Sequence, residues 1–321
     1  MGSRSRTGVL LATAAALALS GSGCGDSSTG SSADGSEAAD AAFPVTVRDA
    51  TRRVTIERRP ERIVSLSPSA TETLFAVGAG DQVTAVDDES DHPRGVPTTD
   101  LSSYQPNVEA IAGHRPDLVV VPASVPRDVK GGLRRLGLAV LAEPAPDGLE
   151  DAYHQMRELG LATGHAAAGH RLAQRVRGEV ERRIAAAPDG PSLDVFHELD
   201  PDLYSASSDT FIGRIYERLG LRNVADPAAR RTGSPYPQLS SEAVVSANPD
   251  LVVLADTECC EQTPAKVARR PGWDEVSAVR NGAVVGIDDD VASRWGPRIP
   301  AFVTRVVDAM EVARESAGGR R

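Results

Sequence analysis

The sequence predicts an α/β protein of two similar lobes, each with a parallel-rich sheet, joined by one long rigid helix. The main observation is a repeat: NVEAIAGHRPDLVVVPA (107–123) and SSEAVVSANPDLVVLAD (240–256) align without gaps. Both copies contain Glu-Ala and, further on, Pro-Asp-Leu-Val-Val at the same offset. Each is typical of a short helix, a proline-marked turn and a strand buried on both faces. A strand entered from a helix is the basic α/β unit, so two distant copies indicate two lobes.

Strands and helices alternate through the first half of the chain. We expect a hairpin at 45–47 and 53–56, strands at 62–66, 83–86 and 139–141, and helices at 71–77 and 127–136, with the first repeat copy between. Residues 87–97 are expected to form a polar loop. The glycines of VGAGDQV follow a helix instead of opening one, so they indicate a helix end and turn and not a dinucleotide-binding loop.

Two helices separate the halves, at 149–161 and 165–187. The second contains no proline and would span about 34 Å at about 1.5 Å per residue, so we interpret it as a rigid connector that permits only small closure of the lobes. The second half repeats the plan. Its expected elements are strands at 193–198 and 282–287, helices at 210–219 and 297–317, a short helix within 269–279, and the second repeat copy.

The N-terminus is typical of an exported protein. Residues 1–24 contain two arginines, a short apolar core and then Cys24, which resembles a bacterial lipoprotein signal, although Gly21 stands where that pattern usually has leucine. An ordinary secretory signal with an incidental cysteine is the alternative. Residues 25–42 contain no large apolar side chain and are expected to form a disordered tether. The N-terminal lobe is expected at 43–148, the connecting helices at 149–189 and the C-terminal lobe at 190–321.

Composition excludes one class of function. The 321-residue chain has a formal net charge of −10 and no stretch of clustered basic residues. Nucleic-acid binding is therefore not expected. The sequence also contains no phosphate-binding loop, serine-nucleophile elbow or zinc-protease motif, so we predict no catalytic residues and no enzyme. A hydrolase with its active site between the lobes is the alternative of another class.

Several motifs together resemble the substrate-binding proteins of ABC importers for vitamin B12 and ferric siderophores. They are RIVSLSPSATETLFAVGAGDQV, both repeat copies, the long central helix and SPYPQLSSE, which together cover about residues 43–315. The resemblance implies the class III periplasmic-binding fold. It also implies a monomeric lipoprotein on the outer face of the cytoplasmic membrane, anchored by lipid on Cys24. Such a protein would hold a metal chelate in the interlobe cleft, need no cofactor, and deliver the ligand to a permease dimer with its ATPase.

The same resemblance implies roles for individual residues. Glu109 and Glu242, one in each repeat copy, match the glutamates that pair with permease arginines. A first-turn glutamate is also favoured by the helix dipole alone. The candidate ligand contacts are the aromatic, histidine and charged residues of the expected cleft loops: His92, Tyr104, Tyr204, Tyr236, Asp290, Arg294 and its neighbour Trp295.

The ligand stays open between cobalamin, a ferric siderophore and haem. Tyrosines suit a large macrocycle, because they bury much apolar area. Anionic ferric siderophores would instead need arginines, for which the sequence offers Arg230, Arg231, Arg294 and Arg298. His92, His197 and Glu198 could neighbour a metal, but no close-spaced ligand pair is present, so we predict no dedicated metal site. We expect the Asp288–Asp290 run to be a solvated loop.

Cys259 and Cys260 are adjacent in DTECCEQTP, which the family pattern does not explain. In an exported protein they could oxidise, and we predict a vicinal disulfide. Adjacent cysteines close a strained eight-membered ring, so such a bond would be labile. A soft-metal site and two free thiols are the alternatives.

Overall fold

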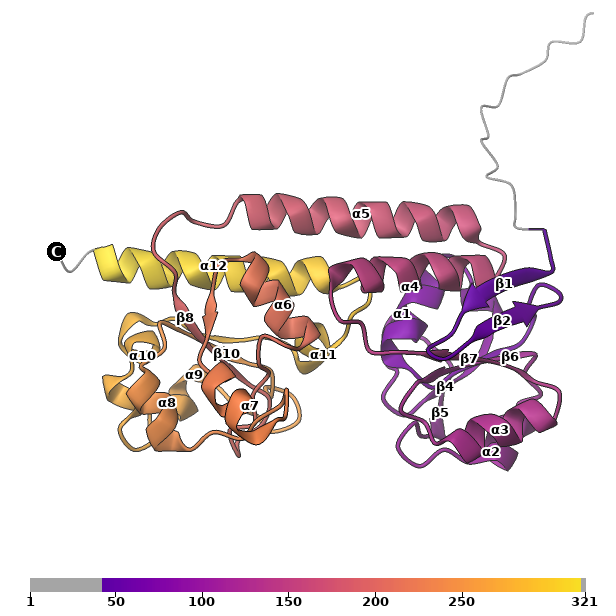
Figure 1. The fold of residues 1–321 in the computed structure, drawn as a ribbon, viewed down its shortest axis with the longest axis horizontal. Helices are drawn as coiled ribbons and strands as arrows, with labels where there is room; N and C mark the ends of the chain where they lie inside the picture. The colour runs from indigo at the N-terminus through magenta and orange to yellow at the C-terminus, as the bar shows by residue number, and fades with distance from the viewer. Residues whose placement is uncertain (1–41, 319–321) are drawn as a thin grey trace, which may run out of the picture. The chain divides into compact units, whose positions relative to one another are not determined.

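A computed structural model describes residues 42–318 of the chain (Figure 1). The predicted signal segment with Cys24, and the predicted tether up to residue 41, lie outside this range. Across the described residues, no helix is both long enough and apolar enough to cross a bilayer.

The first sheet is parallel throughout and contains five strands within the described chain. Its order is β5 (Thr98–Leu101), β4 (Val83–Asp87), β3 (Ile63–Ser65), β6 (Leu118–Pro122) and β7 (Ala139–Glu143). A separate antiparallel hairpin, β1 (Val45–Arg48) and β2 (Arg53–Ile56), precedes it as predicted. The sequence did not predict β5, because this edge strand has one buried residue and no apolar run.

The second sheet repeats the first with one strand fewer. Its four described strands are parallel, in the order β9 (Arg222–Asn223), β8 (Asp194–Glu198), β10 (Leu251–Leu254) and β11 (Val284–Gly286). Strand β10 carries the second repeat copy and lies between β8 and β11, as β6 lies between β3 and β7. The strand order is therefore the same in both sheets, which confirms the prediction of two similar lobes.

The repeat also encodes how each helix begins. Asn107 caps α2 (Val108–Gly113), and its side chain accepts a hydrogen bond from Ala110 N at 2.8 Å. Ser240 caps α8 (Ser241–Ala247) in the same way, accepting from Ala243 N at 3.2 Å. A side-chain oxygen at this position satisfies an N–H group that the first helical turn cannot pair internally.

The turn between helix and strand is equally repeated. Arg115 and Asn248 both adopt the left-handed conformation, with φ of 51° and 50°, directly before the repeated proline. The next residue, Asp117 or Asp250, accepts hydrogen bonds from the N–H groups at or just before the start of the neighbouring strand, at 2.9–3.0 Å. Pro-Asp therefore joins two adjacent strands as well as ending a turn.

Shorter helices cover the sheets. In the first half they are α1 (Pro68–Ala76), the 3₁₀ turn η1 (Gly80–Gln82), α2 and α3 (Arg127–Arg135). In the second half they are α6 (Phe211–Arg218), α7 (Asp226–Thr232), α8, α9 (Pro264–Val267), the 3₁₀ turn η2 (Trp273–Glu275), α10 (Ser277–Asn281) and α11 (Asp289–Ser293).

The short helix expected within 269–279 is α10, which begins at Ser277 because Pro271 and Gly272, which has a φ of 79°, interrupt the segment before it. One prediction for the second half needs correction. The acidic run at 288–290 is not a loop. Asp288 caps α11 by accepting a hydrogen bond from Val291 N at 3.0 Å, and Asp289 and Asp290 form its first turn, where carboxylates are favoured.

Three long helices connect the halves: α4 (Leu149–Ala162), α5 (Ala166–Ala185) and α12 (Ile299–Gly318). Helix α5 is the predicted connector, and it packs against α4 and α12, which run beside it (Figure 1). One continuous cluster of buried apolar side chains includes residues of both sheets and of all three helices. The connector is therefore a packed layer of helices and not a single exposed rod.

The closest approach of α4 and α5 depends on two glycines. A Cβ atom on Gly169 would lie 2.8 Å from Met156 O and 3.0 Å from Gly160 Cα. Both obstacles belong to the backbone, so they cannot rotate away.

We predict that Gly169→Ala destabilises the protein by about 1–3 kcal/mol, because the methyl group would force the two helices apart. Gly178→Ala on the same helix is the matched control. Its Cβ would meet only the Arg182 guanidinium at 3.5 Å, and alanine there gains helix propensity of up to about 1 kcal/mol. Urea denaturation of both variants measures the difference, and equal stability of the two would contradict the packing argument.

Candidate functional site

A cleft of about 790 Å³ opens at the carboxyl ends of the strands. Loops that follow β3, β4, β5 and β6 line one side, and loops that follow β10 and β11 line the other. In open α/β sheets, ligands bind outside the carboxyl ends of the strands. This cleft is therefore the candidate ligand site.

Carboxylates dominate the charged groups of the cleft. Among the described side chains that line it, seven are acidic and one is basic. The acidic residues are Asp88, Glu89, Asp91, Glu258, Asp288, Asp289 and Asp290, and the basic residue is Arg294. The field inside the cleft is therefore strongly negative.

The donor groups of Arg294 are already engaged. Its side chain is only 10% exposed and lies 2.5 Å from Asp290 Oδ1, 3.1 Å from Asp91 Oδ1 and 3.4 Å from Glu72 Oε1. It also donates to the backbone oxygen of Glu89 at 2.7 Å. Arg294 consequently fixes the cleft wall, and its charge is offset by neighbouring carboxylates.

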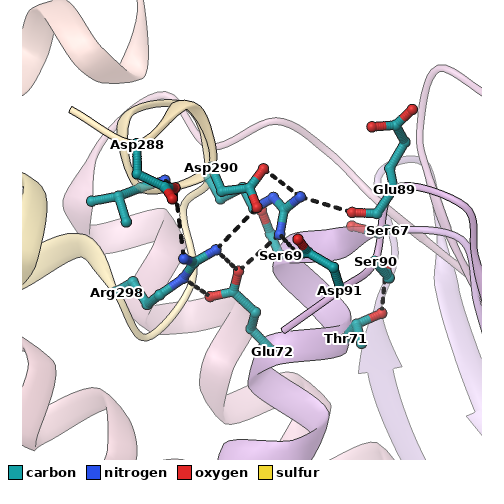
Figure 2. Close-up of polar contacts among 12 residues, drawn as sticks. Ser67, Ser69, Thr71, Glu72, Glu89, Ser90, Asp91, Asp288, Asp290 and Arg298 are labelled. Carbon is teal, nitrogen blue, oxygen red and sulfur yellow. Dashed lines mark hydrogen bonds and ion pairs between the residues drawn. The ribbon is translucent and has the colours of Figure 1, made fainter. Parts of the chain in front are cut away.

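A second arginine, Arg298, also joins the two lobes. Arg298 precedes α12, and Glu72 lies on α1 with 1% of its side chain exposed. Arg298 donates twice to Glu72, from Nε at 3.0 Å and from Nη2 at 2.6 Å (Figure 2). We call the group Glu72, Asp91, Asp288, Asp290, Arg294 and Arg298 the interlobe brace. It fixes the first lobe to the segment that leads into the last helix.

Negative charge is in excess within the interlobe brace, and one carboxyl group shows the effect. Burial raises the pKa of Asp290 to about 6. Arg294 opposes this shift, whereas Asp91 and Asp288 reinforce it. When the pH drops through about 6, Asp290 takes up a proton and the cleft wall becomes less negative.

Four of the sequence-predicted contacts lie together. Tyr104, Asp290, Arg294 and Trp295 all line the cleft. Tyr104 is 81% exposed, so its ring has almost no protein partner. The backbone N–H of Trp295 donates to Ser69 Oγ at 3.2 Å, which holds this loop against the opposite lobe.

The other three predicted contacts do not line this cleft. His92 is exposed on the loop after Asp91. Tyr204 and Tyr236 are also partly exposed and lie on neighbouring strand-like segments, where Ser205 N donates to Pro237 O at 3.0 Å. These tyrosines are near each other but are not among the cleft-lining side chains.

Most alternative ligand groups considered from the sequence are used elsewhere in the fold. His197 is fully buried, its Nδ1 lies 2.7 Å from Tyr216 Oη, and burial lowers its pKa to about 3. Glu198 accepts two hydrogen bonds from Arg270, both at 2.6 Å. Arg230 and Arg231 are exposed on α7 and do not line the cleft.

Sequence reasoning missed Glu72 and most of the acidic wall, by which we mean the seven carboxylates that line the cleft. The available signal for Glu72 was a carboxylate among the small and apolar residues of PSATETLFA. A charge on a buried helix face requires a cationic partner. The wall residues Asp88, Glu89, Asp91 and Glu258 had no such signal, because each belongs to a polar loop that looks solvated by itself.

The repeated glutamates occupy equivalent exposed positions. Glu109 and Glu242 lie in the first turns of α2 and α8. Hydrogen bonds from its own backbone N–H and from Ser240 lower the pKa of Glu242. Both side chains are available to a partner.

Comparison with known proteins gives a consistent result. A family model described as periplasmic binding protein matches residues 63–291. The chain is 34% identical over 281 residues to a cobalamin-binding protein of Halobacterium salinarum, covering 83% of this chain and 74% of that protein. It is 30% identical over 278 residues to an ABC transporter substrate-binding lipoprotein of Bacillus subtilis, covering 84% of this chain and 86% of that protein.

Solved structures show the same architecture. The periplasmic vitamin B12 binding protein of Vibrio cholerae superposes with a TM-score of 0.66 at 24% identity, over 80% of this chain and 98% of that chain. The family model includes both sheets and the helices between them, and both sequence relatives extend over most of the chain. The chain therefore belongs to the periplasmic binding protein family.

Proposed function

We propose that this protein is the substrate-binding lipoprotein of an ABC importer and that it captures a cobalamin-type metal chelate in the interlobe cleft. The names of the two sequence relatives support the importer role and the ligand class. The lipid anchor on Cys24 and the outer face of the cytoplasmic membrane as its location belong to the same proposal. A permease with its ATPase would receive the ligand.

The acidic wall carries the choice of ligand. The seven carboxylates outweigh the one arginine, whose charge is already paired, so the cleft repels an anionic chelate, whereas a neutral or cationic chelate meets no such barrier. Ferric siderophores with net negative charge, and haem with its two propionates, are disfavoured for this reason. A neutral corrinoid, whose edge consists largely of amides, is the class that remains.

The contacts that we propose are aromatic and polar. Tyr104 from the first lobe and Trp295 from the second would cover the macrocycle, since aromatic rings bury a large apolar area with little loss of entropy. Asp290 would present carboxylate oxygens from the wall, and Arg294 would act on the ligand through its hold on Asp290 and Asp91. We keep three residues outside the cleft lining as proposed contacts at the edge of the cleft: His92, Tyr204 and Tyr236.

We also propose that the cleft is largely preformed. The interlobe brace and the packed layer of α4, α5 and α12 both resist separation of the lobes. A hinge requires a few residues that absorb large changes in φ and ψ, and packed long helices do not provide them.

We predict that the protein discriminates by charge between ligands of one shape. Hydrolysing one peripheral amide of cobalamin to a carboxylate should weaken binding about fivefold at low salt, or about 1 kcal/mol, because the added charge faces the acidic wall. The difference should shrink at about 0.5 M salt and below pH about 6, where Asp290 takes up a proton. Titration followed by tryptophan fluorescence measures the affinity of the protein for each of the two ligands.

The exposed wall residue Asp88 provides a matched variant for this experiment. Asp88→Asn should narrow the difference between the two ligands without loss of cobalamin binding. Equal affinity for both ligands at low salt would contradict selection by charge. Failure of every chelate to bind would contradict the proposed function itself.

We predict that Glu72→Gln destabilises the protein by about 3 kcal/mol, because it leaves Arg298 without its bidentate partner in a buried site. Asp288→Asn is the control. Asp288 Oδ1 is 3.9 Å from Arg298 and half-exposed, and asparagine caps a helix as well as aspartate, so a change within about 1 kcal/mol is expected. Urea denaturation compares them, and a neutral Glu72→Gln would show that the interlobe brace does not hold the lobes.

We predict that reversing both repeated glutamates, Glu109→Arg with Glu242→Arg, lowers cobalamin uptake roughly tenfold through loss of two exposed ion pairs with the permease. The affinity of the isolated protein for the ligand should not change, because both residues lie outside the cleft. Reversal of Asp308 and Glu311, exposed on α12, is the control. Normal uptake by the Glu109/Glu242 variant would rule out the docking role.

A further inference from the structure

The loop that follows β10 presents two adjacent cysteines beside the cleft. Cys259 and Cys260 are joined as a vicinal disulfide, and Cys259 is exposed and lines the cleft. Apart from Cys24, they are the only cysteines of the chain. Neither the family resemblance nor the cobalamin proposal uses them.

The loop is held firmly in place. The carboxylate of Asp289 accepts hydrogen bonds from three successive backbone N–H groups, those of Thr257, Glu258 and Cys259, at 2.6, 3.0 and 2.9 Å. The hydroxyl of Thr257 donates to the same carboxylate at 3.1 Å. The backbone that carries Cys259 is therefore held in the wall of the cleft by contacts that do not involve the sulfur–sulfur bond.

We propose that this pair is a redox-gated binding site for a thiophilic divalent cation. A dithiol transfers two electrons and two protons to the pair and is itself oxidised to a disulfide, so the bond between Cys259 and Cys260 breaks and leaves two thiols beside the exposed residue Glu258 in the sequence. A bound cation then displaces both thiol protons and bonds to two thiolates, the ligands that soft metals prefer. Among the described residues, no group of three or more His, Cys, Asp or Glu side chains is arranged to hold a metal ion, so the proposed binding depends on the two thiolates that reduction releases.

The surroundings favour a cation over other thiol reagents. Glu258 and the acidic residues Asp288, Asp289 and Asp290 line the same part of the cleft. Lys266, a nearby cation, already lies 3.7 Å from Glu261. Surplus negative charge attracts cations, and a metal ion has to displace the thiol protons before it bonds to the sulfurs. Binding should consequently weaken as the pH falls.

The test is a titration with cadmium ion, which needs no chelate and is therefore independent of the proposed function. The full mature chain is treated with a dithiol, freed of it, and titrated while the sulfur-to-metal ultraviolet absorption is followed. We expect the reduced chain to bind one more cadmium ion than the double variant Cys259→Ser with Cys260→Ser binds. The oxidised chain should give no sulfur-to-metal absorption. The double variant retains Cys24 and so subtracts its contribution.

Glu258→Gln tests the third donor and should weaken cadmium binding on the order of 10- to 100-fold. Circular dichroism checks that each variant is folded, as expected for changes at exposed or half-buried positions. Equal binding by the oxidised chain or by the double serine variant would assign the cation to the carboxylates and overturn the proposal. Absence of binding to the reduced chain would overturn it as well.

Discussion

The ion pair between buried Glu72 and half-buried Arg298 determines much of the architecture around the cleft. Burying two charges carries a desolvation penalty that their attraction barely offsets, so such a pair gives geometry more than stability. Here two hydrogen bonds from Arg298 to Glu72 join the segment before α12 directly to α1 of the first lobe. Arg294 completes the interlobe brace by pairing with Asp91 and Asp290. Both arginines near the cleft therefore pair with carboxylates of the protein and not with a ligand.

The fold could be predicted because its main signals are local. In each repeat copy the cap, the left-handed residue before proline and the strand-joining aspartate lie within a dozen residues, and each has its own physical reason. Strand β10 then takes the same place in its sheet as β6. The elements that the sequence did not reveal, such as β5 and α11, are short and contain no apolar run, so the hydrophobic pattern did not mark them.

The candidate site could be predicted only in part, for the opposite reason. Tyr104, Asp290 and Arg294 were found through resemblance to a family pattern, and Trp295 was found as a neighbour of Arg294; all four line the cleft. Glu72 and Arg298 are 226 residues apart, and no local pattern reports such a contact. No local pattern reports the acidic wall either. Its carboxylates come from separate loops, each unremarkable alone, and their common field exists only after folding.

Rigidity and charge act together in this arrangement. A protein whose lobes closed widely could adjust its contacts to many ligands after binding them. With the lobes fixed by the interlobe brace and by the packed helices, the wall must select its ligand in the conformation that the ligand first meets. The long-range field of the carboxylates acts before any contact forms, so charge is the property that such a cleft can test first.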